Sequence, residues 1–182
     1  MSDAQIELTG NLLLATPALR DGIFDRSVIL LADHSADGGA FGLILNQPTG
    51  HEVSHFLNKP EFEALARIPV HVGGPVSREQ LTFSAFWWNP KDGLHWQIRL
   101  PAAEAIQRTR QPGVLVRAFI GYSGWTEGQL ENELRHQSWI TAKPGPNLLG
   151  KPHDQELWAD ILKSMSPFHR LLADAPASPE LN

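Results

Sequence analysis

The sequence contains no cysteine, and this absence limits both its architecture and its chemistry. Without cysteine the chain forms no disulfide, offers no thiolate nucleophile and lacks the sulfur ligands of many structural zinc sites. Any metal site would therefore use nitrogen and oxygen ligands alone. We expect no cofactor, because neither a Walker motif nor a dinucleotide-binding glycine loop is complete.

The sequence also lacks an excess of basic residues and any long hydrophobic run. It holds 15 Lys and Arg against 20 Asp and Glu, and the formal net charge of −5 opposes binding to phosphate backbones. Apolar runs such as Val28–Ala32 are far too short to cross a bilayer, and the first residues lack the basic region of a signal peptide. We therefore expect a cytoplasmic protein that neither binds DNA directly nor enters a membrane.

Length and composition favour one globular domain over residues 1–182. With 42% hydrophobic and 19% charged residues, the chain has enough apolar surface for a core. Short apolar runs between turn residues predict strands, and apolar residues spaced by three and four predict helices. The expected strands cover residues 12–15, 28–32, 41–46, 70–72, 81–86, 94–98, 114–122 and 138–142, and the expected helices cover 102–108, two short segments on either side of Pro60, one segment after Thr126 and one after Asp154.

The connections between these segments indicate an α+β fold. The strands at 28–32 and 41–46 are too close in sequence for a helical crossover, so we expect them to pair as an antiparallel hairpin. The run at 114–122 is expected to be a central strand. We predict a mixed, mostly antiparallel sheet with helices packed on its faces, and barrel-like closure stays open as an alternative. Residues 166–182 are expected to form a loose tail.

Residues 51–55, HEVSH, match the H-E-x-x-H pattern of zinc metalloproteases. On a helix, His51 and His55 would share one face and Glu52 could serve as general base. The helix would be short because Pro60 follows within two turns, and no third ligand occurs at the usual downstream spacing. We therefore expect an exposed polar face rather than a zinc site, and we assign no metal ligand.

Two glycine motifs are further candidates for a binding site: VGGPV at Val72–Val76 and GYSGW at Gly121–Trp125. Neither is a complete phosphate-binding loop, and glycine clusters mostly serve turns or close packing. GYSGW is expected to end a strand and open a helix, because Thr126 and Gln129 form a capping-box pattern. The backbone N–H groups of such a helix end could receive an anion or a carbonyl group.

A catalytic serine has little support in the sequence. Ser27, Ser123, His34 and Asp25 are all available for a Ser-His-Asp arrangement. However, no G-x-S-x-G nucleophile elbow occurs, and the spacing within GYSGW does not force a strained nucleophile turn. No catalytic residue is therefore assigned from the sequence.

Several motifs occur in an order and spacing that are specific when taken together. They are GNLLLATPAL at 10–19, FDRSVILLADH at 24–34, GAFGLILNQP at 39–48, VHVGGPV at 70–76, FIGYSGWTEGQLENEL at 119–134 and Trp139. With these motifs nearly the whole chain resembles the YqgE/AlgH family of bacterial proteins. His51 and His55 have no counterpart in the family pattern, which argues further against zinc. The resemblance implies an α+β fold and a transcriptional regulator linked by name with alginate production, without an established biochemical activity.

Two classes of function remain for this chain. We favour a regulatory or interaction protein that acts indirectly on transcription by binding a small molecule or a protein partner. Trp87 and Trp88 support this class, because strand alternation cannot bury both on one face and one is expected to line a pocket or a protein contact. The alternative is a small-molecule hydrolase or another enzyme with a polar pocket formed by Arg26, His34, Asn46, Tyr122 and Glu131.

The candidate ligand-binding residues are expected to converge from distant parts of the chain. They are Arg26, His34, Asn46, Gly73, Gly74, Tyr122, Ser123, Trp125 and Glu131. Arg26 starts one strand and Asn46 ends its antiparallel neighbour, so both should lie at one sheet edge and meet Tyr122 and Trp125 in one pocket. The alternative is that Arg26 pairs with a neighbouring aspartate at the surface while the glycines only shape turns. The sequence predicts neither the oligomeric state nor the identity of the ligand.

Overall fold

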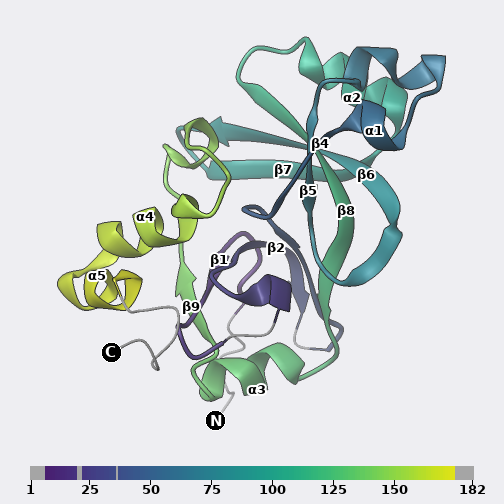
Figure 1. The fold of residues 1–182 in the computed structure, drawn as a ribbon. Coiled ribbons are helices and arrows are strands. Elements are labelled where there is room, and N and C mark those ends of the chain that lie inside the picture. Colours follow the sequence, from purple (N-terminus) through teal and green to yellow (C-terminus); the bar gives the residue numbers. More distant parts are fainter. Residues whose placement is uncertain (1–6, 20–21, 36, 175–182) are drawn as a thin grey trace.

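The computed structural model describes residues 7–19, 22–35 and 37–174. These residues form an α+β domain in which a mixed sheet curls into a half-barrel and helices pack on it (Figure 1), which confirms the predicted fold class. The strands are β1 (Leu12–Ala15), β2 (Val28–Ser35), β3 (Gly39–Ile44), β4 (Pro48–Glu52), β5 (Pro69–Val72), β6 (Val76–Asn89), β7 (Gly93–Leu100), β8 (Val114–Trp125) and β9 (Trp139–Ala142). The helices are η1 (Gly22–Phe24), α1 (Val53–Phe56), η2 (Pro60–Leu65), α2 (Ala102–Thr109), α3 (Gln129–Arg135), η3 (Leu148–Gly150), α4 (Glu156–Met165) and α5 (Pro167–Ala173).

The sheet has the strand order β4-β5-β8-β3-β2-β1-β9, and β6 pairs with β8 and β7 outside this path. Strands β2 and β3 form the predicted antiparallel hairpin, and β5 and β8 are parallel neighbours in an otherwise antiparallel set of pairs. Strand β8 pairs with β5 and β6 along its first part and with β3 through its last three residues. The two parts of the curved sheet therefore meet on β8.

The inner face of the half-barrel carries the largest cluster of buried side chains, and α4 closes it on one side (Figure 1). Phe86 of β6 and Phe119 of β8 belong to this cluster, with ring centres 6.2 Å apart, so alternate residues of both strands also face inward. Trp158 of α4 is fully buried, and its indole N–H donates a hydrogen bond to the carbonyl oxygen of Ala15 over 2.8 Å. This bond fixes α4 to β1.

Two smaller apolar clusters lie outside the half-barrel. Helices α1 and α2 and the η2 turn cover one of them, which includes Val53, Ala85 and Ala118, at one end of the sheet (Figure 1). Helix α3 covers the other through the buried side chain of Leu130. Trp87 packs with the first of these clusters, whereas its neighbour Trp88 packs on the inner face, as strand alternation requires.

Two predicted segments differ in the structure. The two short helices expected on either side of Pro60 are present as α1 and the 3-10 helix η2, but His51 and Glu52 of the HEVSH segment belong to strand β4, which pairs with β5, and not to a helix. Residues 167–173, which were expected in a loose tail, form α5, and the hydroxyl oxygen of Ser166 caps it by accepting the His169 N–H over 3.2 Å. Residues 175–182 of the expected tail lie outside the described residues.

Strand β8 also extends further than expected. The GYSGW segment was predicted to turn from a strand into a helix, but it stays in the strand and pairs with β3 as far as Trp125. Helix α3 begins only at Gln129, whose side-chain oxygen accepts the Thr126 N–H over 3.0 Å, as in a capping box. The N–H groups of this helix end therefore do not lie at GYSGW, so the expectation that they receive an anion beside Tyr122 and Ser123 is wrong.

Candidate functional site

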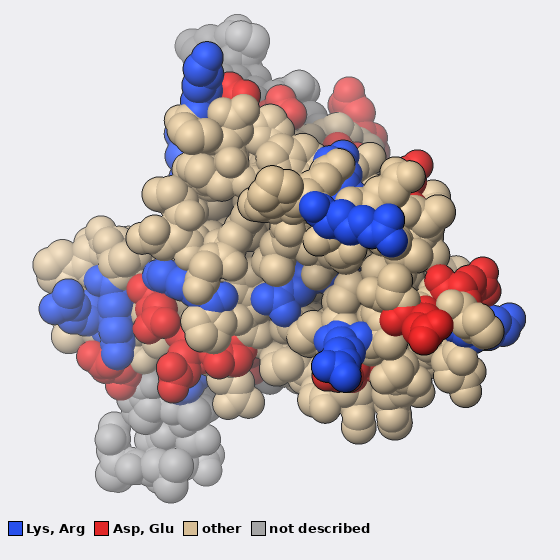
Figure 2. Space-filling view, turned by 90° about the horizontal axis from the view of Figure 1, so that it is seen from above, with Lys and Arg blue, Asp and Glu red and all other residues tan. Residues whose placement is uncertain are grey.

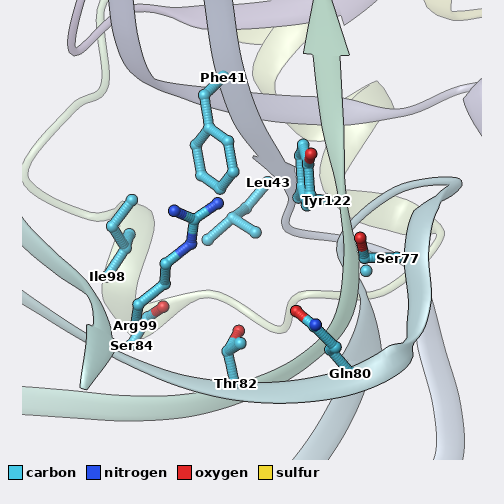
Figure 3. Close-up of a pocket in the computed structure, with 10 residues that line it drawn as sticks. Phe41, Leu43, Ser77, Gln80, Thr82, Ser84, Ile98, Arg99 and Tyr122 are labelled. Carbon is cyan, nitrogen blue, oxygen red and sulfur yellow. The ribbon is translucent and has the colours of Figure 1, made fainter. Parts of the chain in front are cut away.

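The site begins with a bulge in β7 that changes the direction of one arginine. Phe83 pairs with Leu100 and Ala85 pairs with Gln97, so two residues of β7, Ile98 and Arg99, stand opposite the single residue Ser84 of β6. Arg99 has the left-handed φ of +55°, which is uncommon outside glycine. A bulge of this kind re-aims side chains. Figure 3 shows the result, with the guanidinium of Arg99 pointing toward the ring of Phe41 and lying on the same side of the sheet as Tyr122.

Two aromatic rings support the guanidinium of Arg99. Phe41 of β3 and Tyr122 of β8 stack with ring centres 4.7 Å apart and planes 30° from parallel. The guanidinium carbon of Arg99 lies 4.8 Å from the Phe41 ring centre and 5.7 Å from that of Tyr122. This cation–π contact holds the face of the guanidinium and leaves its N–H edge available. In the described part of the chain, Arg99 has no carboxylate partner.

A small cavity with both polar and apolar walls lies beside this arginine. It is lined by Phe41, Leu43, Ser77, Gln80, Thr82, Ser84, Ile98, Arg99, Gly121 and Tyr122 (Figure 3). Its volume of about 20 Å³ suits a water molecule or one small group of a ligand, such as a carboxylate. Ser84 is fully buried, and its hydroxyl has no hydrogen-bond partner among the described residues. Buried hydroxyls are nearly always bonded to protein or to ordered water, so this one is available to a water molecule or to a group of a ligand in the cavity.

The opposite wall of the cavity is a wide irregularity of β6. Val76 pairs with Tyr122 and Leu81 pairs with Ile120, so the four residues 77–80 of β6 stand opposite the single residue Gly121. Ser77 has a φ of +53°, and it lines the cavity together with Gln80. Left-handed backbone at a non-glycine residue costs free energy, and such residues cluster at functional sites. Two of them, Ser77 and Arg99, line this one small cavity.

The two glycine motifs build the wall of the site by close backbone packing. A Cβ atom on Gly74 would lie 2.1 Å from the carbonyl carbon of Tyr122, and one on Gly121 would lie 2.4 Å from the Gly74 oxygen. The Gly73 oxygen accepts hydrogen bonds from the Ser123 hydroxyl over 3.0 Å and from the Ile44 N–H over 2.9 Å. Gly73, Gly74 and Ser123 therefore hold β8 and its neighbours together, which agrees with the close-packing alternative for these motifs.

Arg26 and Asn46 lie together, as predicted, but at a different place from Tyr122. The Asn46 amide donates to the Arg26 carbonyl oxygen over 2.9 Å, and its own oxygen accepts the Val28 N–H over 2.8 Å. Both residues line a polar cavity of about 290 Å³ with Gly22, Asp25, Gln47 and Gln155. This cavity shares no lining residue with the Arg99 cavity. The expected single pocket is therefore wrong, because the guanidinium of Arg26 stacks on Trp158 at 5.4 Å instead.

His34 and Glu131 also form a pair of their own. The Leu8 N–H donates to His34 Nδ1 over 3.1 Å, so Nε2 carries the proton and donates to Glu131 Oε1 over 2.7 Å. This hydrogen bond lowers the pKa of Glu131 below its usual value. The pair ties α3 to the end of β2, and it does not contact the Arg99 cavity.

Trp125 serves the attachment of α3 to the sheet. Oε1 of Glu133 accepts the indole N–H of Trp125 over 3.1 Å and that of Trp139 over 3.2 Å. Both indoles are buried in the cluster beneath α3, with ring centres 6.2 Å apart. Trp125 is therefore part of the core at the end of β8, away from the Phe41 and Tyr122 rings of the candidate site.

The HEVSH segment does not form the helix that zinc metalloproteases use. His51 and Glu52 belong to β4 and only His55 belongs to α1, although the two imidazole rings stack with centres 3.9 Å apart. All three side chains are exposed. Within the described residues, no group of three or more His, Asp and Glu side chains could hold a metal ion.

Most of the residues that form the candidate site carry no signal in the sequence. Tyr122 was found through its motif, but Arg99, Phe41 and Ser84 were not. The alternation of Leu94, Trp96 and Ile98 places Arg99 on the opposite face, and only the bulge reverses that assignment. A bulge depends on pairing between strands, so the alternation pattern alone gives no signal of it.

Comparison with known proteins agrees with this fold and with the sequence motifs. The family model described as AlgH-like matches residues 12–169. A UPF0301 protein of Streptomyces coelicolor is 36% identical over 96% of this chain and 95% of its own length. A UPF0301 protein of Cytophaga hutchinsonii is 34% identical over 95% of this chain and 98% of its own length.

Two solved structures share the fold. Protein DIP2367 from Corynebacterium diphtheriae has a TM-score of 0.72 at 22% identity, covering 92% of each chain. The AlgH protein from Pseudomonas aeruginosa has a TM-score of 0.66 at 23% identity, covering 97% of this chain and 98% of its own. At these identities the likeness concerns the fold alone.

The half-barrel of mixed strands, with a small cavity on its inner face, defines the class of this protein as an α+β protein with one curved sheet. Within that class, the chain belongs to the AlgH-like family, together with the UPF0301 proteins. None of the helices in the described ranges is long and apolar enough to span a membrane.

Proposed function

We propose that this protein is a ligand-binding protein that recognises a carboxylate or phosphate group with Arg99. The observation that carries the proposal is the guanidinium itself, which a strained backbone and two aromatic rings hold over a small cavity. A planar guanidinium with a free N–H edge binds such oxyanions through two parallel hydrogen bonds. Ser84, Gln80 and Thr82 add hydroxyl and amide groups to the same cavity.

The ligand-bound state would act on gene expression only indirectly, through a protein partner. A net charge of −5 opposes direct binding to DNA. On the face in Figure 2, Lys and Arg side chains are scattered among uncharged and acidic residues and form no continuous basic surface. These features favour a signal carried by ligand binding over one carried by DNA contact.

An enzymatic function has less support in the side-chain geometry. Within the described residues, the hydrogen bond of a serine hydroxyl with a histidine is that of Ser166 with His169, at 2.7 Å, and this serine caps α5. Ser123 donates to a backbone carbonyl, and Ser84 has no neighbouring base within hydrogen-bond distance. The Arg99 cavity therefore supports binding better than nucleophilic catalysis.

Acetate titration followed by NMR tests the proposal, with the Arg99 Nε–H signal as the probe. We expect saturable binding on the order of millimolar, because a single carboxylate provides few contacts. Arg99→Met should abolish it. Arg108→Met is the matched control, because Arg108 lies 5.0 Å from the ring centre of Trp87 in an equivalent cation–π contact outside the cavity. Absence of binding, or binding that Arg99→Met leaves intact, would refute the proposal.

The indirect mode of action needs a separate measurement. We expect fluorescence anisotropy to give only weak binding of this protein to promoter duplexes at physiological salt, and competitor DNA should remove it. Submicromolar affinity that survives excess competitor would instead show that the protein binds DNA directly and specifically.

A further inference from the structure

A second arginine lies on the inner face next to the Arg99 cavity. Arg117 of β8 pairs directly with Ser84 of β6, and directly paired residues project their side chains to the same face of a sheet. Ser84 is also the residue that stands opposite the bulge at Ile98 and Arg99. The buried Ser84 hydroxyl therefore lies on the strand between two arginines, Arg99 on β7 and Arg117 on β8.

The surroundings of Arg117 contain unpaired polar atoms. Six buried side-chain atoms lack a partner in the described part of the chain, and three of them are Ser84 Oγ, Arg117 Nε and His71 Nδ1. His71 of β5 pairs with Phe119, two residues beyond Arg117, so these three residues share the inner face across neighbouring strands. Arg117 is half-buried but its Nε atom is buried, and an unpaired buried donor is costly unless a bound group or a water molecule accepts its hydrogen bond.

No protein carboxylate compensates the charge of Arg117 in the described ranges. Its titratable neighbours are His71 and His153, and burial lowers the pKa of both imidazoles, which favours their neutral forms. The Nε2–H group of His71 donates to the His153 carbonyl oxygen over 3.0 Å, so Nδ1 of the neutral ring has a lone pair and no proton. Asp154 acts on His153 but is not among the groups that influence His71. The positive charge of Arg117 is thus left for a ligand.

We infer that Arg117 and Ser84 form a second anion subsite beside the Arg99 cavity, so that the ligand is a short molecule with two anionic groups, such as a dicarboxylate. One group lies against the N–H edge of Arg99, and the other accepts hydrogen bonds from Arg117 Nε and from the Ser84 hydroxyl. This inference rests on the proposed function, because it assumes that the first group binds Arg99. It goes beyond the proposed function by stating that the site selects a ligand with two anionic groups rather than one.

Calorimetric titration with acetate and glutarate at equal ionic strength tests the second subsite. The protein should bind glutarate at least about tenfold more tightly than acetate, because a second charge-assisted pair adds more than about 1.4 kcal/mol. Arg117→Met should remove this preference and leave the affinity for acetate unchanged. Ser84→Ala should reduce the preference, and Arg108→Met should leave both affinities as they are.

The outcomes separate the inference from the proposed function. Equal affinity for the two acids, or an undiminished preference in Arg117→Met, overturns the second subsite while acetate binding through Arg99 still stands. If Arg117→Met loses acetate binding together with the glutarate preference, Arg117 has a structural role, and the second subsite is also overturned. Absence of binding by either acid overturns both proposals. Should Arg117→Met fail to fold, Arg117→Lys keeps the charge but lacks the Nε donor, and its glutarate preference must fall.

Discussion

The guanidinium carbon of Arg99 lies 4.8 Å from the ring centre of Phe41, although the backbone of Arg99 has a left-handed φ of +55°. A left-handed conformation costs a residue with a Cβ atom about 1–2 kcal/mol, and glycine does not incur this cost. The side chain of Arg99 is exposed, so filling the core does not require an arginine there. The strained backbone is therefore explained best by the position of the guanidinium, which the bulge places beside the Phe41 and Tyr122 rings.

Replacing Arg99 separates the strain of its backbone from the binding of an anion by its guanidinium. Arg99→Gly should be more stable than Arg99→Ala by about 1 kcal/mol, because only the alanine keeps the strained Cβ atom. Both variants should lose acetate binding, because both lack the guanidinium. Urea unfolding measures the first difference and NMR titration the second. Equal stability of the two variants would show that the bulge imposes no strain at this position.

Much of the fold could be predicted from the sequence because it depends on local patterns. The hairpin of β2 and β3 follows from two apolar runs with a short connection, and β8 follows from a long apolar run. Its extension through Gly124 to Trp125 could not be predicted in this way, because it depends on pairing with β3, which is distant in sequence. The same holds for β4, whose exposed residues become a strand only against β5.

The candidate site could be predicted less well than the fold. Arg26 and Asn46 do lie together, because ends of antiparallel neighbours meet, and Tyr122 does line a cavity. The sequence motifs could not separate these two places, since Arg26 precedes β2 whereas Tyr122 faces Arg99 across the inner face. Arg117 was not found either, because an arginine in an apolar strand looks like a solvent-facing residue until the helices and the rest of the sheet are placed around it.

The packing of the two glycine motifs gives a second prediction. Gly74→Ala should destabilise the protein by about 3 kcal/mol or more, because its Cβ atom would lie 2.1 Å from backbone atoms of Tyr122, which cannot yield as the end of a flexible side chain would. Gly145→Ala is the control, since a Cβ atom there meets nothing within 4 Å. Thermal unfolding of both variants measures the effect. A Gly74→Ala protein with unchanged stability would contradict the close contact between the two motifs.

The attachment of α3 gives a third prediction. Glu133→Ala should lower the free energy of unfolding by about 2–4 kcal/mol, because it leaves the buried indole N–H groups of Trp125 and Trp139 without their acceptor. Glu133→Gln should cost less, since its amide oxygen can still accept. Denaturant unfolding followed by tryptophan fluorescence gives both values. If the two variants are equally stable, the indole hydrogen bonds do not hold α3.

The last prediction concerns the pH dependence that His71 creates. Burial lowers the pKa of His71 to about 4, and the charge of Arg117 contributes in the same direction. In the unfolded chain the imidazole titrates at its ordinary value near 6.5. Between pH 6.5 and 4 the unfolded state therefore binds more protons than the folded state, and stability falls as the pH is lowered through this window.

The difference in pKa of His71 corresponds to on the order of 3 kcal/mol across that window. His71→Gln should remove much of the slope between pH 6.5 and 4, because glutamine does not titrate and its amide can donate to the His153 carbonyl. His136→Gln is the control, since His136 is exposed on the segment after α3. Chemical unfolding at several pH values measures the slope in each protein. If His71→Gln keeps the full slope, another group causes the acid sensitivity, and His71 is protonated in the folded state.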